Sequence, residues 1–186
     1  MLIEQKNACL VLIDVQEKLA MQVHSSHKML ERCEWLLTLA SELNIPCILS
    51  EQYPQGLGKT VPALTTAAQP FACIDKVHFS CYRNASFKDS LHKTSKKQCV
   101  LIGIETHVCV LQTAIDLKQA GYDVFIVVDA VSSRHHEDHA YALKRMQQEG
   151  IFLVTSEMVF FEWVEKAGTP EFKAMSKKYL LPPKKT

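Results

Sequence analysis

The sequence predicts a three-layer α/β domain, a sandwich with a six-stranded, mostly parallel sheet in the middle. Six apolar runs alternate with segments of helical pattern along the 186 residues. Continuous apolar runs are typical of parallel strands, because helices cover both faces of such a sheet. Strands that alternate with helices are joined by right-handed crossovers, which make neighbouring strands parallel. We therefore expect a single domain over 1–186, with its core over about 8–159 and a C-terminal helical tail over 160–186.

The predicted strands are short apolar runs bounded by polar or turn residues. They cover 8–14, 46–50, 71–76, 98–104, 123–130 and 151–155. Ligands of open α/β sheets bind outside the carboxyl ends of the strands. The residues at these ends are therefore the first candidates for a functional site.

Three helical patterns end at residues that stop a helix. They cover 27–43, 106–120 and 135–149, and they are followed by "NIP", Gly121 and Gly150. A further helix is expected near 156–166, and a shorter one after "GTPEF", before a basic tail, "PPKKT". Phe160, Phe161 and Trp163 could serve either the core or an interface between subunits.

The charge balance gives no indication of the function. The chain has 21 basic and 20 acidic residues and a net charge of +1, so no global field favours nucleic acid or anionic lipid. The start, "MLIEQKNACLVLID", is typical of neither a signal peptide nor a membrane span. We expect a cytosolic (cytoplasmic) protein that contacts no membrane.

The seven cysteines do not predict a disulfide framework, because their number is odd and no C-x-x-C pair occurs. Four of them lie in or beside apolar strand segments and are expected to be small buried hydrophobic residues: Cys9, Cys47, Cys73 and Cys99. Cys33 is expected in a helix with partial exposure, and Cys81 in a loop.

Three reactive groups lie at strand ends. Asp14 closes the first strand, Lys76 closes the third, and Cys109 lies one turn into the helix that follows the fourth. Each alone has a structural explanation: a turn residue, a solvated lysine, a packed thiol. Together they form the base, stabiliser and nucleophile that acyl transfer requires. A helix N-terminus and an ammonium group favour a thiolate, so Cys109 is expected to ionise well below the free-thiol pKa of about 8.5.

Three segments around these residues, "LVLIDVQ", "DKVHFS" and "GIETHVCVLQTA", resemble the three motifs of the isochorismatase-like cysteine hydrolase superfamily. The resemblance covers about 8–159. Its most specific part is a G-x-x-T-x-x-C-V element formed by Gly103, Thr106, Cys109 and Val110. Two further segments, "SEQYPQGLG" and "VDAVSSR", are similar to the YcaC-related and isochorismatase-domain branch.

The resemblance implies a Rossmann-like fold and a role for each matching residue. Cys109 matches the nucleophile, Asp14 the general base, and Lys76 the residue that keeps the other two charged. A non-proline cis peptide maps to the bond between Ile104 and Glu105, and the backbone N–H groups of Glu105 and Cys109 match an oxyanion hole. The implied enzyme is a cofactor-independent hydrolase that cleaves a small amide or related acyl compound through a thioester. Members usually associate, so a homo-oligomer built from dimers is expected.

No catalytic metal is expected. Nicotinamidases share the triad but carry an Asp-x-His pair after the second strand, where this chain reads "SEQYPQGLGKT". His135 and His139 are spaced at i and i+4, which suits a metal, but no third ligand is apparent in the sequence. A solvated helix start is the favoured interpretation of this pair.

Several other residues are candidates for substrate contacts or for structure. Tyr53, in the loop after the second strand, and His107, two residues before the nucleophile, are expected to contact substrate. Asp129 and Arg134, in "DAVSSR", are expected to form a structural loop pair.

Two alternatives to the amidohydrolase stay open. The chain could be a non-catalytic or redox-responsive α/β binding protein that retains the thiol, since fold does not determine function. Hydrolysis of a vinyl ether, as in isochorismate, is a third possibility, but it needs no thiol nucleophile.

Overall fold

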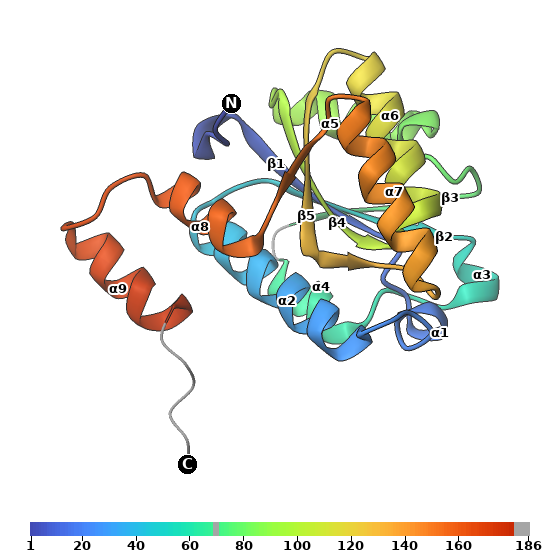
Figure 1. Ribbon diagram of the computed structural model, residues 1–186, viewed down its shortest axis with the longest axis horizontal. Coiled ribbons are helices and arrows are strands. Elements are labelled where there is room, and N and C mark those ends of the chain that lie inside the picture. The colour runs from blue at the N-terminus through green and yellow to red at the C-terminus, as the bar shows by residue number, and fades with distance from the viewer. Residues whose placement is uncertain (69–70, 181–186) are drawn as a thin grey trace.

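The computed structural model describes residues 1–68 and 71–180 and contains a six-stranded sheet (Figure 1). The strand order is β3-β2-β1-β4-β5-β6, and every adjacent pair is parallel. The predicted α/β class with a six-stranded sheet is confirmed.

All six predicted strands are present, and no end differs by more than two residues from the expected one. They are β1 (Ala8–Ile13), β2 (Cys47–Gln52), β3 (Phe71–Lys76), β4 (Gln98–Ile104), β5 (Asp123–Ser132) and β6 (Phe152–Val154). Because all are parallel, their carboxyl ends lie along one edge of the sheet. Asp14 and Lys76 are therefore brought to the same edge.

Side chains of the central strand β1 alternate between two hydrophobic cores. Leu10 and Leu12 pack into one core with α2 (Ser26–Glu42), α4 (Pro62–Ala67) and α8 (Ser156–Val164). Cys9 and Val11 pack into the other core with α5 (Ala85–Thr94), α6 (Leu111–Gln119) and α7 (His136–Gln148). Helices thus cover both faces, which explains why β1 is apolar throughout.

Several short helical elements escaped the sequence analysis. They are α1 (Glu17–Ala20), α3 (Pro54–Leu57), α4, α5, and the 3-10 turns η1 (Gln5–Asn7) and η2 (Cys81–Arg83). In α5 only Phe87 and Leu91 are buried, so its apolar stripe is too narrow to stand out. The expected helix over 106–120 begins as a π-helical turn, η3 (Thr106–Val110), and continues as α6. Within 1–68 and 71–180, no helix combines the length and the apolar character needed to cross a membrane.

The aromatic residues of α8 divide between core and surface. Phe160 and Trp163 are buried, whereas 49% of Phe161 is exposed. The expected short helix of the tail is α9 (Pro170–Tyr179), whose Tyr179 ring meets the Trp35 ring edge to face at 5.2 Å. The "PPKKT" tail lies outside the described residues.

Two expectations about cysteine exposure are wrong. Cys73 is exposed because β3 is an edge strand with a partner on one side only. Cys33 is fully buried in the α2 core. Cys81, expected in a loop, is the first residue of the 3-10 turn η2 and is fully buried as well. All seven cysteines are free thiols.

Candidate active site

Asp14 lies directly after β1 and is almost fully buried. Its backbone has φ 52°, in the left-handed region that a non-glycine residue rarely adopts. Its carboxylate accepts two hydrogen bonds: Oδ1 from Ser50 Oγ at 2.7 Å and Oδ2 from Lys76 Nζ at 2.6 Å. Both carboxylate oxygens are therefore oriented from the neighbouring strands β2 and β3.

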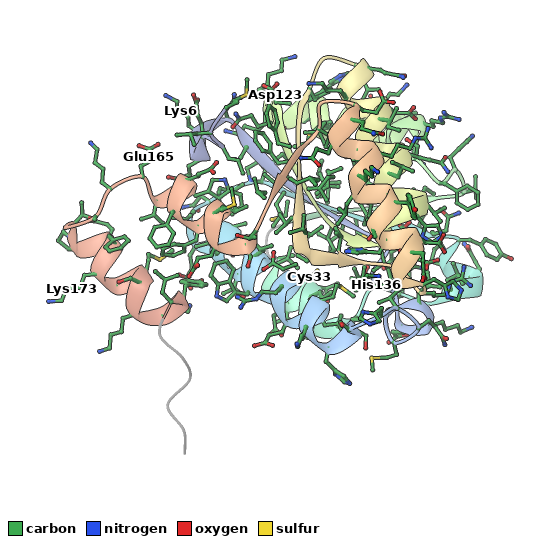
Figure 2. All side chains as sticks on the ribbon, in the orientation of Figure 1. Lys6, Cys33, Asp123, His136, Glu165 and Lys173 are labelled. Atoms are coloured by element: carbon green, nitrogen blue, oxygen red, sulfur yellow. The ribbon has the colours of Figure 1, made fainter. Side chains whose placement is uncertain are left out.

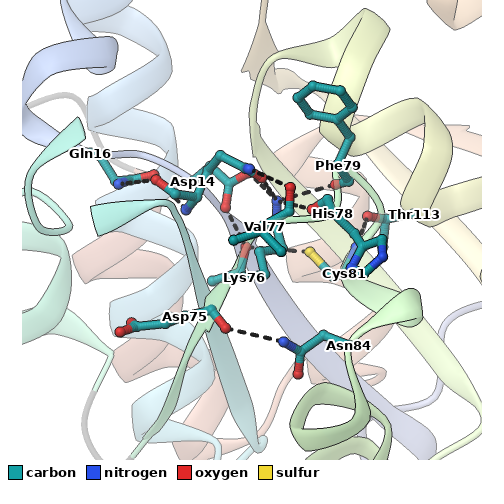
Figure 3. Close-up of polar contacts among 12 residues, drawn as sticks. Asp14, Gln16, Asp75, Lys76, Val77, His78, Phe79, Cys81, Asn84 and Thr113 are labelled. Atoms are coloured by element: carbon teal, nitrogen blue, oxygen red, sulfur yellow. Dashed lines mark hydrogen bonds and ion pairs between the residues drawn. The ribbon is translucent and has the colours of Figure 1, made fainter. Parts of the chain in front are cut away.

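Lys76 ends β3, and its side chain is fully buried against Asp14 (Figure 3). Nζ also donates to Gln52 Oε1 at 2.7 Å and to the backbone carbonyls of His78 and Phe79 at 3.2 and 3.1 Å. Burial alone would lower the pKa of Lys76, but the charges of Asp14 and the nearby thiols outweigh it and raise the pKa. Lys76 is therefore a permanent cation at neutral pH.

Cys109 lies in the η3 turn, and only 6% of it is exposed. Its thiol lies near enough to the Asp14 carboxylate for that charge to act on its pKa, which links all three predicted site residues. Burial, and next to it the Asp14 charge, raise the pKa of the Cys109 thiol, and the opposing effect of Lys76 is smaller. The expectation that the thiolate forms well below pH 8.5 is therefore wrong for the resting protein. The charge of Asp14 therefore affects the pKa of the thiol more strongly than the charge of the Lys76 ammonium group does.

Gly103 explains how the nucleophile turn comes close to Asp14. It pairs in register with Ile13, and its φ is +113°. A Cβ at this position would lie 2.2 Å from the Ile13 carbonyl oxygen, so no larger residue fits. The peptide bond between Ile104 and Glu105 is cis, at the position that the resemblance implies.

Three polar residues of the site were missed in the sequence. Ser50 and Gln52 hold Asp14 and Lys76 directly, and Cys81 Sγ lies 3.3 Å from Ser50 Oγ. Burial raises the pKa of the Cys81 thiol to about 11. The location of Ser50 and Gln52 at the end of a predicted strand was the signal that could have identified them.

The two predicted substrate contacts lie in different surroundings. Tyr53 follows Gln52 at the carboxyl end of β2, and 55% of it is exposed. Both ring nitrogens of His107 contact other parts of the chain instead. Its Nδ1 lies 3.0 Å from Ser133 Oγ, and its Nε2 lies 3.7 Å from Asp138. Tyr53 has the freedom that a substrate contact needs, whereas His107 attaches η3 to the start of α7.

The predicted loop pair of Asp129 and Arg134 is wrong. Arg134 Nε pairs with Glu105 Oε2 at 3.1 Å, and its backbone N–H donates to the same carboxylate. Asp129 accepts hydrogen bonds from the backbone and the hydroxyl of Ser156. The two side chains therefore contact different parts of the chain: Arg134 contacts Glu105, and Asp129 contacts Ser156. Their short separation in sequence gave no sign of this.

The histidine pair also differs from expectation. His135 is the N-cap residue of α7, as a helix start predicts. His139, however, is partly buried, and its Nδ1 lies 3.0 Å from Thr106 Oγ1 in the nucleophile turn. The interpretation of this pair as a solvated helix start is therefore wrong for His139.

A cluster at the sheet edge could offer ligands to a cation. Glu51, Cys73 and Asp75 place three ligand atoms within 4.8 Å of one another. Lys59 Nζ already lies 2.9 Å from Glu51 and 3.9 Å from Asp75, so a cation of the chain balances these charges.

Comparisons with known proteins find similar proteins over most of the chain. The family model described as Isochorismatase domain matches residues 8–158. Isochorismatase domain-containing protein 2B of Mus musculus is 40% identical over 173 residues, which cover 92% of this chain and 80% of that protein.

Two solved structures are similar along almost the whole chain. The MAR1 ribonuclease of Caenorhabditis elegans has a TM-score of 0.90 and 38% identity, and the match covers 100% of both chains. The YcaC gene product of Escherichia coli, described as an octameric hydrolase of unknown specificity, has a TM-score of 0.86 and 26% identity over 96% of each chain.

Proposed function

The chain belongs to the isochorismatase family of hydrolases, and we propose that it is a cofactor-independent cysteine hydrolase that cleaves a small amide or related acyl compound. One observation carries the proposal. In a buried site, the carboxylate of Asp14 accepts a hydrogen bond from the Lys76 ammonium group at 2.6 Å and raises the pKa of the nearby Cys109 thiol. A non-catalytic scaffold gains little from three buried reactive groups, because each is costly to desolvate.

The first half of the reaction forms a thioester. Asp14 accepts the thiol proton as Cys109 Sγ attacks the carbonyl carbon, since the raised pKa of the thiol disfavours a preformed thiolate. The backbone N–H groups of Glu105 and Cys109 stabilise the oxyanion. Asp14 then returns the proton to the leaving nitrogen, and the C–N bond breaks to release an amine or ammonia.

The second half of the reaction hydrolyses the thioester. Asp14 removes a proton from a water molecule, whose oxygen attacks the thioester carbonyl. The C–S bond breaks, the sulfur regains a proton from Asp14, and a carboxylic acid leaves. Lys76 keeps its proton throughout, because its raised pKa lies above 10.5.

The proposed chemistry needs no metal. The segment after β2, "SEQYPQGLGKT", lacks the Asp-x-His pair of nicotinamidases, and its Gln52 uses its side-chain oxygen to accept a hydrogen bond from Lys76. Seven free thiols suit the reducing cytosol, where we place the protein.

We also propose a homo-oligomer built from dimers. The octameric description of the Escherichia coli relative supports it, as do exposed apolar side chains on α7 and α8, among them Tyr141 and Phe161. Light scattering should find a species heavier than the 21.1 kDa chain, and a single species of that mass would contradict the assembly.

A ribonuclease activity, as the name of the Caenorhabditis elegans protein suggests, has less support. The net charge of +1 offers no general attraction to a polyanion. The proposed substrate is therefore a small molecule.

A panel of small amides, with released ammonia as the readout, tests the proposed function. Cys109→Ala should lower the rate on any accepted amide by at least about 10³-fold. Cys73→Ala, which removes an exposed thiol outside the site, is the matched control and should keep the wild-type rate. A panel with no turnover, or equal turnover by Cys109→Ala, would favour the binding-protein alternative.

A further inference from the structure

A cavity apart from the triad lies between the first turns of α2 and α7 and the end of β5. Its volume is about 560 Å³, which is ample for a small metabolite. Figures 1 and 2 show His136 at the start of α7, near the first turns of α2. Asp14, Lys76 and Cys109 are not among its lining residues.

Several basic side chains line this cavity. Its walls carry three histidines, His24, His136 and His139, together with Lys28 and Arg32. Lys28 forms no ion pair with any residue that the structure describes.

The two helix starts add further donors. Neither N-cap residue, Ser25 of α2 or His135 of α7, makes a side-chain cap hydrogen bond. The Ser25 hydroxyl contacts the His24 ring instead, at 3.0 Å. Backbone N–H groups of the first turn of each helix are thus left to water or a ligand, and they favour an anion.

Two acidic residues also line the cavity, and one of them is already engaged. Both carboxylate oxygens of Asp129 accept hydrogen bonds from Ser156, at 2.8 and 2.6 Å. Arg32 Nε lies 3.8 Å from Asp129 Oδ2 and forms an ion pair with it. The carboxylates of Asp129 and Glu31 balance the permanent charges of Lys28 and Arg32, so the three histidines and the two helix starts supply the net attraction for an anion.

The histidines act on one another electrostatically. Partial burial lowers the pKa of His139, and the charges of His136 and His24 lower it further. Their rings are close, with the His24 and His136 centroids 5.8 Å apart. An anion between them would remove this repulsion.

We propose that this cavity binds the phosphate group of a small phosphorylated metabolite, held by Lys28, the three histidines and the first turns of α2 and α7. A tetrahedral oxyanion accepts hydrogen bonds from several directions, which suits donors that arrive from two helices. The remaining volume accommodates the organic part of the molecule. This inference is independent of the proposed hydrolase activity.

The site is connected to the nucleophile turn through His139, whose Nδ1 contacts Thr106 Oγ1. Thr106 begins the η3 turn that holds Cys109. Phosphate binding should therefore also be detectable at Thr106.

Titration of inorganic phosphate into the full-length protein tests the site, with the histidine ring C–H signals followed by NMR near neutral pH. The signals of His24, His136 and His139 should shift together and saturate, and phosphate should raise the apparent pKa of each ring. Lys28→Ala should weaken binding about tenfold, because it removes an unpaired charge. Acetate, a planar anion, should bind more weakly than phosphate.

The control variant is Lys93→Ala, which removes an exposed lysine on α5, away from the cavity, and should leave phosphate affinity unchanged. Circular dichroism of both variants verifies that they fold. Three outcomes would overturn the inference: no saturable shift at millimolar phosphate, equal weakening by Lys28→Ala and Lys93→Ala, or equal affinity for acetate.

Discussion

Removing the buried cation of the site is the most informative stability experiment. In Lys76→Met the side chain keeps a similar length but loses its charge. Asp14 would then keep Ser50 as its hydrogen-bond donor but would lose the ammonium group at 2.6 Å. The two backbone carbonyls and Gln52 would also lose a donor.

The expected loss in free energy of unfolding is large because neither side chain is accessible to water. Only 0% of the Lys76 side chain and 1% of the Asp14 side chain are exposed. Breaking a buried ion pair by removing one partner costs about 3–5 kcal/mol, chiefly because a charge is left buried without compensation. An exposed pair is worth about 0–1 kcal/mol. Lys178→Met removes a cation from such a pair with Glu42 and is the matched control.

Urea unfolding followed by circular dichroism measures the free energy of unfolding of each variant. The double variant Asp14→Asn with Lys76→Met should be more stable than the sum of the single losses predicts, by about 1–3 kcal/mol, since it leaves neither charge unpaired. A loss below about 1 kcal/mol in Lys76→Met, or simple additivity in the double variant, would refute the buried-pair argument.

The same pair predicts a pH dependence. The pKa of Lys76 is raised in the folded state, so its contribution to stability is complete below its ordinary pKa of 10.5 and is lost as the pH rises through the folded-state value. The stability difference between wild type and Lys76→Met should therefore shrink above about pH 10.5. A constant difference over that range would contradict the raised pKa.

Three further predictions concern the thiol, the close approach of β1 and β4, and α8. Modification of Cys109 by iodoacetamide, followed by mass spectrometry, should keep accelerating from neutral pH to about pH 10, because burial raises the pKa of the thiol; a plateau below about pH 8 would contradict this. Gly103→Ala should lower the melting temperature far more than Gly121→Ala, since both have positive φ but only Gly103 meets another backbone; equal losses would show that φ alone matters. In urea unfolding, Trp163→Ala should lower the free energy of unfolding by about 3–5 kcal/mol, and Phe161→Ala should lower that of the monomer by under about 1 kcal/mol. A larger loss in Phe161→Ala than in Trp163→Ala would contradict the burial of Trp163.

Much of the fold could be predicted because the strands are buried on both faces. Their apolar runs are continuous, and helices such as α7 end at residues that favour termination. The order of the strands could not be read from the pattern. Cys73 was therefore expected to be buried, although its strand lies at the edge of the sheet. Short elements such as α3 follow from tertiary contacts and carry little periodicity of their own.

The residues of the site could be predicted from the sequence, but the pKa of the Cys109 thiol could not. Asp14, Lys76 and Cys109 lie at strand ends, and a parallel sheet collects such ends at one edge. The degree of burial and the position of the thiol between an anion and a cation appear only in three dimensions. They reverse the expected direction of the Cys109 pKa. Ser50 was missed because a serine at the end of a strand is common in turns and does not by itself indicate a hydrogen bond to a site residue such as Asp14.

Mass spectrometry of the protein quenched during turnover tests the central claim most directly. With an accepted amide, the account predicts an acyl adduct on the peptide that contains Cys109, with the mass of the substrate minus its amine. Asp14→Asn should slow both the formation and the hydrolysis of the adduct, and Cys109→Ala should show none. Turnover by wild type with no adduct, together with undiminished turnover by Cys109→Ala, would contradict the thioester mechanism.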